Sequence, residues 1–130
     1  MVKKIKVLVE WCGKNFGAAS EEVLGCVATG DSVEDIKDGY TSALELHFKG
    51  MKEDGDEVPE NYELEFELTT QALLRSLDGR TTLKAIHRAT GINENLLSHY
   101  YTGRKKARLQ QHTRIINGIH EIAKELFSIV

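Results

Sequence analysis

No stretch of this 130-residue chain is apolar for the roughly twenty residues that a membrane-spanning helix requires. The apolar run within residues 1–11 is short and interrupted, so we expect no signal peptide. The two cysteines, Cys12 and Cys26, lack CxxC spacing, which predicts reduced thiols in a cytoplasmic protein. Membrane-spanning and disulfide-stabilised secreted proteins are therefore not the expected classes.

Motifs for metal or covalent chemistry are also scarce. The five histidines lack metal-ligand spacing, and His47 and His87 lie on apolar stripes, where we expect core or interface residues. Cys12 has no supporting residues for a role as nucleophile, and residues 13–17 lack the spacing of a glycine-rich phosphate loop. We therefore expect no catalytic residues, no metal and no other cofactor.

Charge is distributed unevenly along the chain. The net charge is −3, yet residues 1–68 carry 7 Lys/Arg and 16 Asp/Glu, a balance of −9. Residues 69–130 carry 10 Lys/Arg and 4 Asp/Glu, a balance of +6. The asymmetry predicts two domains, 1–68 and 69–130, in which the acidic domain suits a basic protein and the basic domain suits a polyanion.

Alternation of apolar and polar residues in the first half predicts strands over residues 3–12, 16–20 and 26–29. Ser32 has the chemistry of an N-cap for a helix that Gly50 can end. A loop over residues 52–61 and a strand over 62–68 follow. The order strand–strand–strand–helix–strand predicts an α+β domain with one helix on one face of the sheet.

The last of these strands carries a row of glutamates. Glu63, Glu65 and Glu67 alternate with apolar residues and would lie about 7 Å apart on the face away from the core. Nothing nearby in the sequence compensates their mutual repulsion. Two interpretations stay open: the row is a site for Lys or Arg side chains of another protein, or it is a solvated face that keeps the strand soluble.

The second half has a helical pattern. Thr70 is expected to cap a short helix, and Thr81 or Thr82 the next. A long helix over residues 109–129 carries an apolar stripe and closes the domain, and its last turns, 127–130, could supply a dimer contact. The whole chain is thus predicted to be an α+β domain followed by an all-α domain.

Residues 83–103 predict two short helices joined at Gly91, with Asn93 as the cap of the second helix and Gly103 at its end. This is the pattern of a helix-turn-helix unit, whose second helix fits the DNA major groove. The outward polar residues of that helix could bond base edges, and the basic run after it could neutralise phosphates. The expected DNA-binding residues are Asn93, Glu94, Asn95, Ser98, His99, Thr102, Arg104, Lys105, Lys106 and Arg108. The simpler alternative is a helical hairpin with a solvated polar face.

The segment resembles the helix-turn-helix of Xre and lambda-repressor-type transcription factors. The resemblance lies in the Thr90-Gly91-Ile92 turn, the Leu97-Ser98 pair and the Gly103-Arg104-Lys105 end. The family has a small residue four positions before the turn glycine, where its two helices touch. This chain has His87 there, which predicts either a wider helix crossing or a hydrogen bond from the imidazole.

The first half has a resemblance of its own. The run from Leu24 to Ile36, LGCVATGDSVEDI, followed by Ala43-Leu44-Glu45-Leu46, resembles the N-terminal domain of HicB-type antitoxins. That family has a partial ribonuclease H-like βββαβ domain followed by a DNA-binding domain, in many members a helix-turn-helix. The two resemblances occur in the same order as in the family and together cover essentially the whole chain.

The resemblance implies a cytoplasmic antitoxin whose acidic domain binds and masks a small basic HicA-like ribonuclease toxin. Its second domain would bind operator double-stranded DNA as a homodimer or higher homo-oligomer and repress its own operon. In this interpretation Glu63, Glu65 and Glu67 are the candidate toxin-binding residues. The alternative is a stand-alone helix-turn-helix regulator with an N-terminal dimerisation or sensor domain.

An enzyme of the ribonuclease H type is a third hypothesis. It would need several carboxylates converging on two metal ions. Glu10, Glu45 and Glu67 are the only plausible set, and none belongs to a diagnostic motif. Three surface glutamates are the more economical interpretation, so we do not expect an enzyme.

Overall fold

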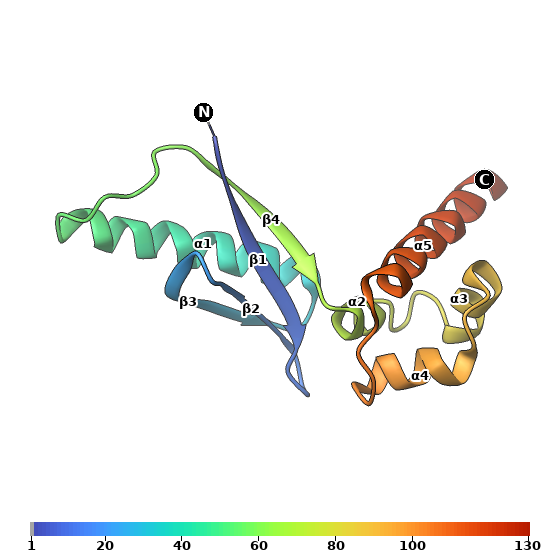
Figure 1. The fold of residues 1–130 in the computed structure, drawn as a ribbon. Helices are drawn as coiled ribbons and strands as arrows, with labels where there is room; N and C mark the ends of the chain where they lie inside the picture. The colour runs from blue at the N-terminus through green and yellow to red at the C-terminus, as the bar shows by residue number, and fades with distance from the viewer. Residues whose placement is uncertain (1) are drawn as a thin grey trace. The chain divides into compact units, whose positions relative to one another are not determined.

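The computed structural model describes residues 2–130 as an α+β protein, with one four-stranded mixed sheet and five helices in that range (Figure 1). The α+β prediction is thus confirmed. The chain divides into two compact units, Met1–Ala72 and Leu73–Val130, whereas the charge pattern placed the boundary after residue 68. Because residues 69–72 carry no charge, the balances of −9 and +6 belong unchanged to these two units.

The sheet of the first unit is formed by β1 (Lys3–Trp11), β2 (Phe16–Ser20), β3 (Val23–Gly30) and β4 (Tyr62–Leu68). Its order is β3-β2-β1-β4, in which β1 pairs antiparallel with β2 and parallel with β4. A parallel pair needs a crossover, and α1 (Val33–Glu53) supplies it by crossing one face of the sheet (Figure 1).

The core of the first unit lies between α1 and the sheet. Ile36, Tyr40, Leu44 and Phe48 are buried at helical spacing and form one core with alternate residues of β1, among them Val7. The opposite residues of β1 and β4 face away from α1. The sheet therefore has one covered face and one open face.

Helix α1 begins as predicted, because the Ser32 side chain accepts a hydrogen bond of 3.0 Å from the backbone N–H of Asp35. The predicted end at Gly50 is wrong. Met51 packs against the core, so burial favours continuation of the helix to Glu53. The left-handed glycine conformation occurs instead at Gly55, with φ of 86°.

Strand β3 is longer than predicted. It runs from Val23 to Gly30, whereas the sequence suggested 26–29. Val23 is buried and pairs with Ser20 past an irregularity in the β2–β3 ladder. Gly25, at φ of 86°, lies inside the strand next to that irregularity instead of ending the pairing.

The second unit is helical. The helices are α2 (Thr70–Ser76), which spans the division between the units, α3 (Leu83–Thr90), α4 (Glu94–Thr102) and α5 (Leu109–Ile129). The buried core residues of the unit are Leu74, Ile86, Ile92, Leu97, Tyr100 and Ile115. None of the helices within residues 2–130 has the length and apolar character needed to span a bilayer.

Local capping defines the starts of two of these helices. Thr82 caps α3 by accepting a hydrogen bond of 3.1 Å from the N–H of Ala85. For α2 the prediction was wrong by one residue, because Thr69 accepts from the N–H of Ala72 at 3.1 Å. Thr70 is instead the first helical residue and is buried.

Candidate nucleic-acid interface and the open sheet face

The turn between α3 and α4 has the local chemistry that the sequence predicted. Gly91 adopts φ of 76° and its N–H donates to the carbonyl of His87, which ends α3. The side chain of Asn93 then accepts a hydrogen bond of 2.8 Å from the N–H of Asn95, which begins α4. Gly103, at φ of 81°, ends α4.

His87 connects the two helices across this turn. Its Nδ1 lies 2.7 Å from the carbonyl oxygen of Ile92, so Nδ1 carries the proton and donates. Of the two expectations for this position, a hydrogen bond from the imidazole is the one realised. His87 was expected to be a core or interface residue, and the first of these alternatives is wrong, because the residue is exposed.

Helix α4 presents a polar face to solvent. Leu97 and Tyr100 are buried, and the helical repeat places Asn95, Ser98 and Thr102 away from them, while Glu94 lies in the exposed first turn. Ser98 is half-buried and the other three are exposed. These four residues are available to a ligand that lies along the outside of α4.

Asn93 and His99 are less available to such a ligand. Asn93 is exposed, but its side-chain oxygen is engaged as the helix cap. His99 is half-buried, and its Nδ1 is buried without a hydrogen-bond partner among residues 2–130. The structure therefore keeps all six predicted residues on α4 or at its cap, but it gives these two a more structural position.

The basic run after α4 lies in the connection to α5. Arg104, Lys105, Lys106 and Arg108 are all exposed. None of the four forms a salt bridge with an acidic residue in the described part of the chain. Their charges are therefore uncompensated locally and open to an anion.

A contact that the sequence analysis missed anchors α4 to the end of α2. The hydroxyl of Tyr101 donates to the carboxylate of Asp78, whose two oxygens lie 2.9 and 2.8 Å away. The guanidinium of Arg75 lies 3.9 Å from the centre of the Tyr101 ring, and its Nε donates to the Tyr101 carbonyl at 3.0 Å. Burial, followed by the hydrogen bond to Asp78, raises the pKa of Tyr101.

Helix α5 holds the end of α3 from the other side. Arg114 donates to the carbonyl of Thr90 at 2.7 Å, satisfying a C-terminal carbonyl of α3. Gly118 is buried where the two helices approach, and a Cβ added there would overlap Cγ2 of Thr90. The glycine in the middle of α5 therefore permits the close α3–α5 packing, a reason that periodicity alone does not reveal.

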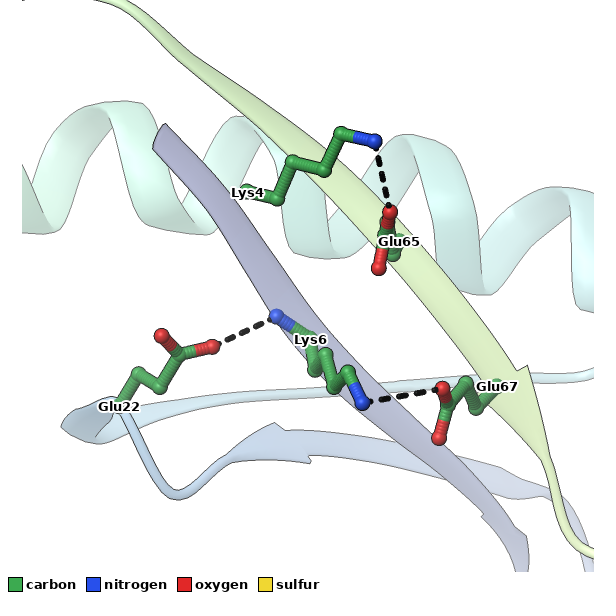
Figure 2. Close-up of polar contacts among 5 residues, drawn as sticks. All are labelled: Lys4, Lys6, Glu22, Glu65 and Glu67. Atoms are coloured by element: carbon green, nitrogen blue, oxygen red, sulfur yellow. Dashed lines mark hydrogen bonds and ion pairs between the residues drawn. The ribbon is translucent and has the colours of Figure 1, made fainter. Parts of the chain in front are cut away.

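The row of glutamates on β4 differs from its prediction. Glu63, Glu65 and Glu67 do lie on the open face, but lysines of the adjacent strand β1 compensate two of them (Figure 2). Nζ of Lys4 lies 3.5 Å from Oε1 of Glu65, and Nζ of Lys6 lies 3.7 Å from Oε1 of Glu67. The expectation of an uncompensated acidic row is therefore wrong, because it ignored which strand pairs with β4.

The open face continues across β1 toward β2. Beyond the last paired residues of β2, the backbone N–H of Lys6 donates to the Glu22 carboxylate at 2.8 Å (Figure 2). A side chain thus replaces the strand partner that β2 no longer supplies. The Glu22 carboxylate is therefore occupied by a hydrogen bond, and those of Glu65 and Glu67 are occupied by salt bridges to lysines.

The carboxylates considered for an enzyme do not converge. Glu10 and Glu67 line the open face of the sheet, whereas Glu45 projects from α1, the helix that covers the other face. Within residues 2–130 no group of three or more His, Cys, Asp or Glu side chains is arranged to hold a metal ion.

Comparison with known proteins adds no family to this description. No family model matches the chain, and no curated protein matches it either.

Proposed function

We propose that this protein is a HicB-type antitoxin. The first unit, as a partial ribonuclease H-like domain, binds a small basic ribonuclease toxin and covers its active surface. The second unit, as a helix-turn-helix domain, binds operator DNA of its own operon and represses it. Neither task needs catalysis or a cofactor, since stable occlusion of the toxin and occupation of the operator are sufficient.

The observation that carries this proposal is the separation of charge between two compact units. The unit Met1–Ala72 has a balance of −9 and the unit Leu73–Val130 a balance of +6. An acidic unit repels nucleic acid and attracts a basic protein, and a basic unit does the reverse. One chain with both units is suited to binding a basic protein and DNA.

For the DNA contact, α4 would enter the major groove with its exposed polar face toward the bases. Asn95 can pair with adenine, Glu94 can accept from cytosine, and Ser98 can bond either. Arg104 and Lys105 follow the C-terminal end of α4, where they would neutralise phosphates and supply affinity without reading sequence. Tyr101 and His87 position α4 through the contacts described above and need not touch DNA.

A single helix-turn-helix reaches one half-site, so operator binding calls for a homodimer and a roughly palindromic operator. The far end of α5 offers a surface for self-association. Ile119, Ile122, Leu126 and Ile129 follow one another at alternating spacings of three and four residues, the repeat of a coiled-coil seam. The first two are half-buried in their own unit, whereas Leu126 and Ile129 are 56% and 77% exposed.

The test is co-expression with the product of the small basic reading frame expected beside this gene. Co-purification of the two proteins, suppression of the partner's ribonuclease activity, and binding of the upstream DNA by this chain would support the proposal. DNA binding without any such partner would instead favour a stand-alone regulator. Magnesium- or manganese-dependent cleavage of nucleic acid that Glu10→Gln abolishes would favour an enzyme and contradict both.

A further inference from the structure

The open face of the sheet has an apolar centre that the antitoxin proposal did not use. A groove of about 720 Å³ runs over β1, β2 and β3 on the side away from α1. Leu8, Leu24 and Val27 line it and are 44%, 81% and 67% exposed. The register places Leu8 opposite Ala19 and Ala19 opposite Val27, so side chains of three adjacent strands meet in one patch.

Such a patch is unusual on a sheet that already has a complete core. The opposite face buries Ile5, Val7 and Val9 beneath α1, so the fold does not need the outer apolar residues for its own packing. Polar residues at these positions would serve solubility and strand formation equally well. A contiguous exposed apolar patch on a folded domain is characteristic of a surface that a partner covers.

The rim of the groove indicates the charge of that partner. Among the described residues that line it, Lys6 is the one basic side chain, and there are four glutamates. Lys6 and Glu67 pair with each other, and Glu22 accepts the N–H of Lys6 (Figure 2). Glu10 and Glu21 remain exposed and form no salt bridge within residues 2–130.

We propose that this groove, formed by the outer faces of β1, β2 and β3, is the docking site for the basic protein that the acidic unit binds. The partner would place an apolar side chain against Leu24 and Val27 and Lys or Arg side chains against Glu10 and Glu21. A second copy of the chain fits less well, because two such rims facing one another would bring like charges together. This inference rests on the proposed function. It places the principal contact with the basic protein on β1, β2 and β3 and not on the glutamate row of β4.

The apolar centre is tested by Leu24→Ser with Val27→Thr in the full-length chain. Both side chains are exposed, so the core is unchanged and α1 still packs on the sheet. The probe is the co-expressed product of the neighbouring basic reading frame, and affinity should fall roughly tenfold or more, as for a central apolar contact. Leu46→Ser is the matched control: Leu46 is 72% exposed on α1, away from the groove, and its replacement should leave affinity unchanged.

The rim is tested by Glu10→Gln with Glu21→Gln. Removing two uncompensated rim charges should slow association with the basic probe, reduce affinity roughly three- to tenfold, and weaken its dependence on salt. Asp38→Asn with Glu53→Gln removes the same charge from exposed positions of α1 and should have a smaller effect. An unchanged urea unfolding transition of the Trp11 fluorescence in each variant checks that the first unit remains folded.

Selective loss of the basic probe by the groove variants supports the docking site. If the probe binds wild-type chain and groove variants equally, the site is elsewhere, and the proposed function stands without it. If the groove variants instead lose self-association in light scattering, the face is a contact between copies and the inference is wrong. If the wild-type chain does not bind the probe at all, the proposed function and this inference both fail.

Discussion

The two longest helices, α1 and α5, have the same length of 21 residues but are used differently. Helix α1 has a side-chain N-cap and buries Ile36, Tyr40, Leu44 and Phe48 along most of its length. Helix α5 has no side-chain cap, and its buried residues, Ile115 and Gly118, lie in its first half. Its C-terminal end, including Phe127 at 87% exposure, is open.

Helix α1 completes the core of its own unit, whereas α5 extends beyond its core and leaves apolar surface exposed. Burial of an amphipathic stripe is what stabilises most protein helices, so the part of α5 beyond Ile122, which lacks such burial, contributes little to its own unit. In the proposed homodimer, a second copy of the chain would provide this missing burial. In the first unit the exposed apolar surface lies instead on the face of the sheet that α1 does not cover.

The largest expected effect comes from the exposed end of α5. Leu126→Glu with Ile129→Glu should convert the proposed homodimer to monomer and reduce operator affinity roughly 100-fold or more, because one half-site would no longer reinforce the other. Light scattering and titration of upstream DNA measure the two effects. The matched control is Leu46→Glu at the exposed position of α1. An unchanged dimer in the double variant would show that α5 is not the dimer contact.

The two long helices also differ in the surroundings of one glycine, Gly118 in α5 and Gly50 in α1. Gly118→Ala should destabilise the second unit by about 1–2 kcal/mol, because overpacking against Thr90 outweighs the gain in helix propensity. The Thr90 side chain cannot easily rotate away, since its hydroxyl bonds Ile86 and Ile92. Gly50→Ala in α1 meets nothing within 4 Å and should stabilise the first unit by about 0.5–1 kcal/mol.

Two optical signals distinguish the units in these unfolding experiments. Trp11, the only tryptophan, reports on β1 by fluorescence, and helical circular dichroism reports on both units. Gly118→Ala should lower the dichroism transition while the Trp11 transition stays in place. An equal shift of both transitions would mean that the two units unfold together.

Arg104→Ala with Lys105→Ala should weaken operator binding about tenfold and reduce the salt slope of log K by roughly 2, one for each lost phosphate contact. Binding of the basic partner should be unaffected, because these residues belong to the other unit. The control is Lys37→Ala with Lys49→Ala, which removes two exposed positive charges from α1. A salt slope that matches wild type would contradict the assignment of the basic run to the phosphates.

The smallest effect is expected at Tyr40, whose buried hydroxyl lies near the Cys26 thiol and has no other hydrogen-bond partner among residues 2–130. Tyr40→Phe should change stability near neutral pH by less than about 1 kcal/mol, since it removes a poorly satisfied polar group. Burial first, and then Cys26, raises the pKa of Tyr40 from 10.0 to about 12. The native state therefore keeps the phenolic proton where the unfolded chain has lost it.

The contribution of Tyr40 to stability is complete below pH 10 and is lost as the pH rises toward about 12. Unfolding by urea, followed through Trp11, should show wild type losing more stability than Tyr40→Phe between neutral pH and about pH 11. Equal losses would mean that Tyr40 does not govern the alkaline sensitivity of the first unit.

The sequence was sufficient for most helix and strand positions because their determinants are local. Ser32, Thr82 and Asn93 each bond a backbone N–H two or three residues away, and Gly91 and Gly103 adopt the left-handed turns expected of them. It failed where burial continued past a local stop signal, as at Gly50, and where a strand extended through a bulge, as at Gly25.

The candidate sites were predictable to different degrees. The polar face of α4 follows from helical periodicity, because buried Leu97 and Tyr100 fix which residues face outward. The acidic face did not follow, because the partners of Glu65 and Glu67 lie on a strand just over sixty residues earlier in the chain. The contacts of Tyr101 with Asp78 and Arg75 likewise join residues more than twenty positions apart.

The sequence by itself determined the element order, the helix caps at Ser32, Thr82 and Asn93, the turn at Gly91 and the opposite charges of the two halves, since each depends on neighbouring residues or on simple counting. Only the tertiary structure decided which charges are compensated, which apolar residues stay exposed and why α5 needs Gly118. The physical reason is that strand pairing and helix packing bring distant residues within a few ångströms. Salt bridges, apolar patches and close approaches depend on that proximity.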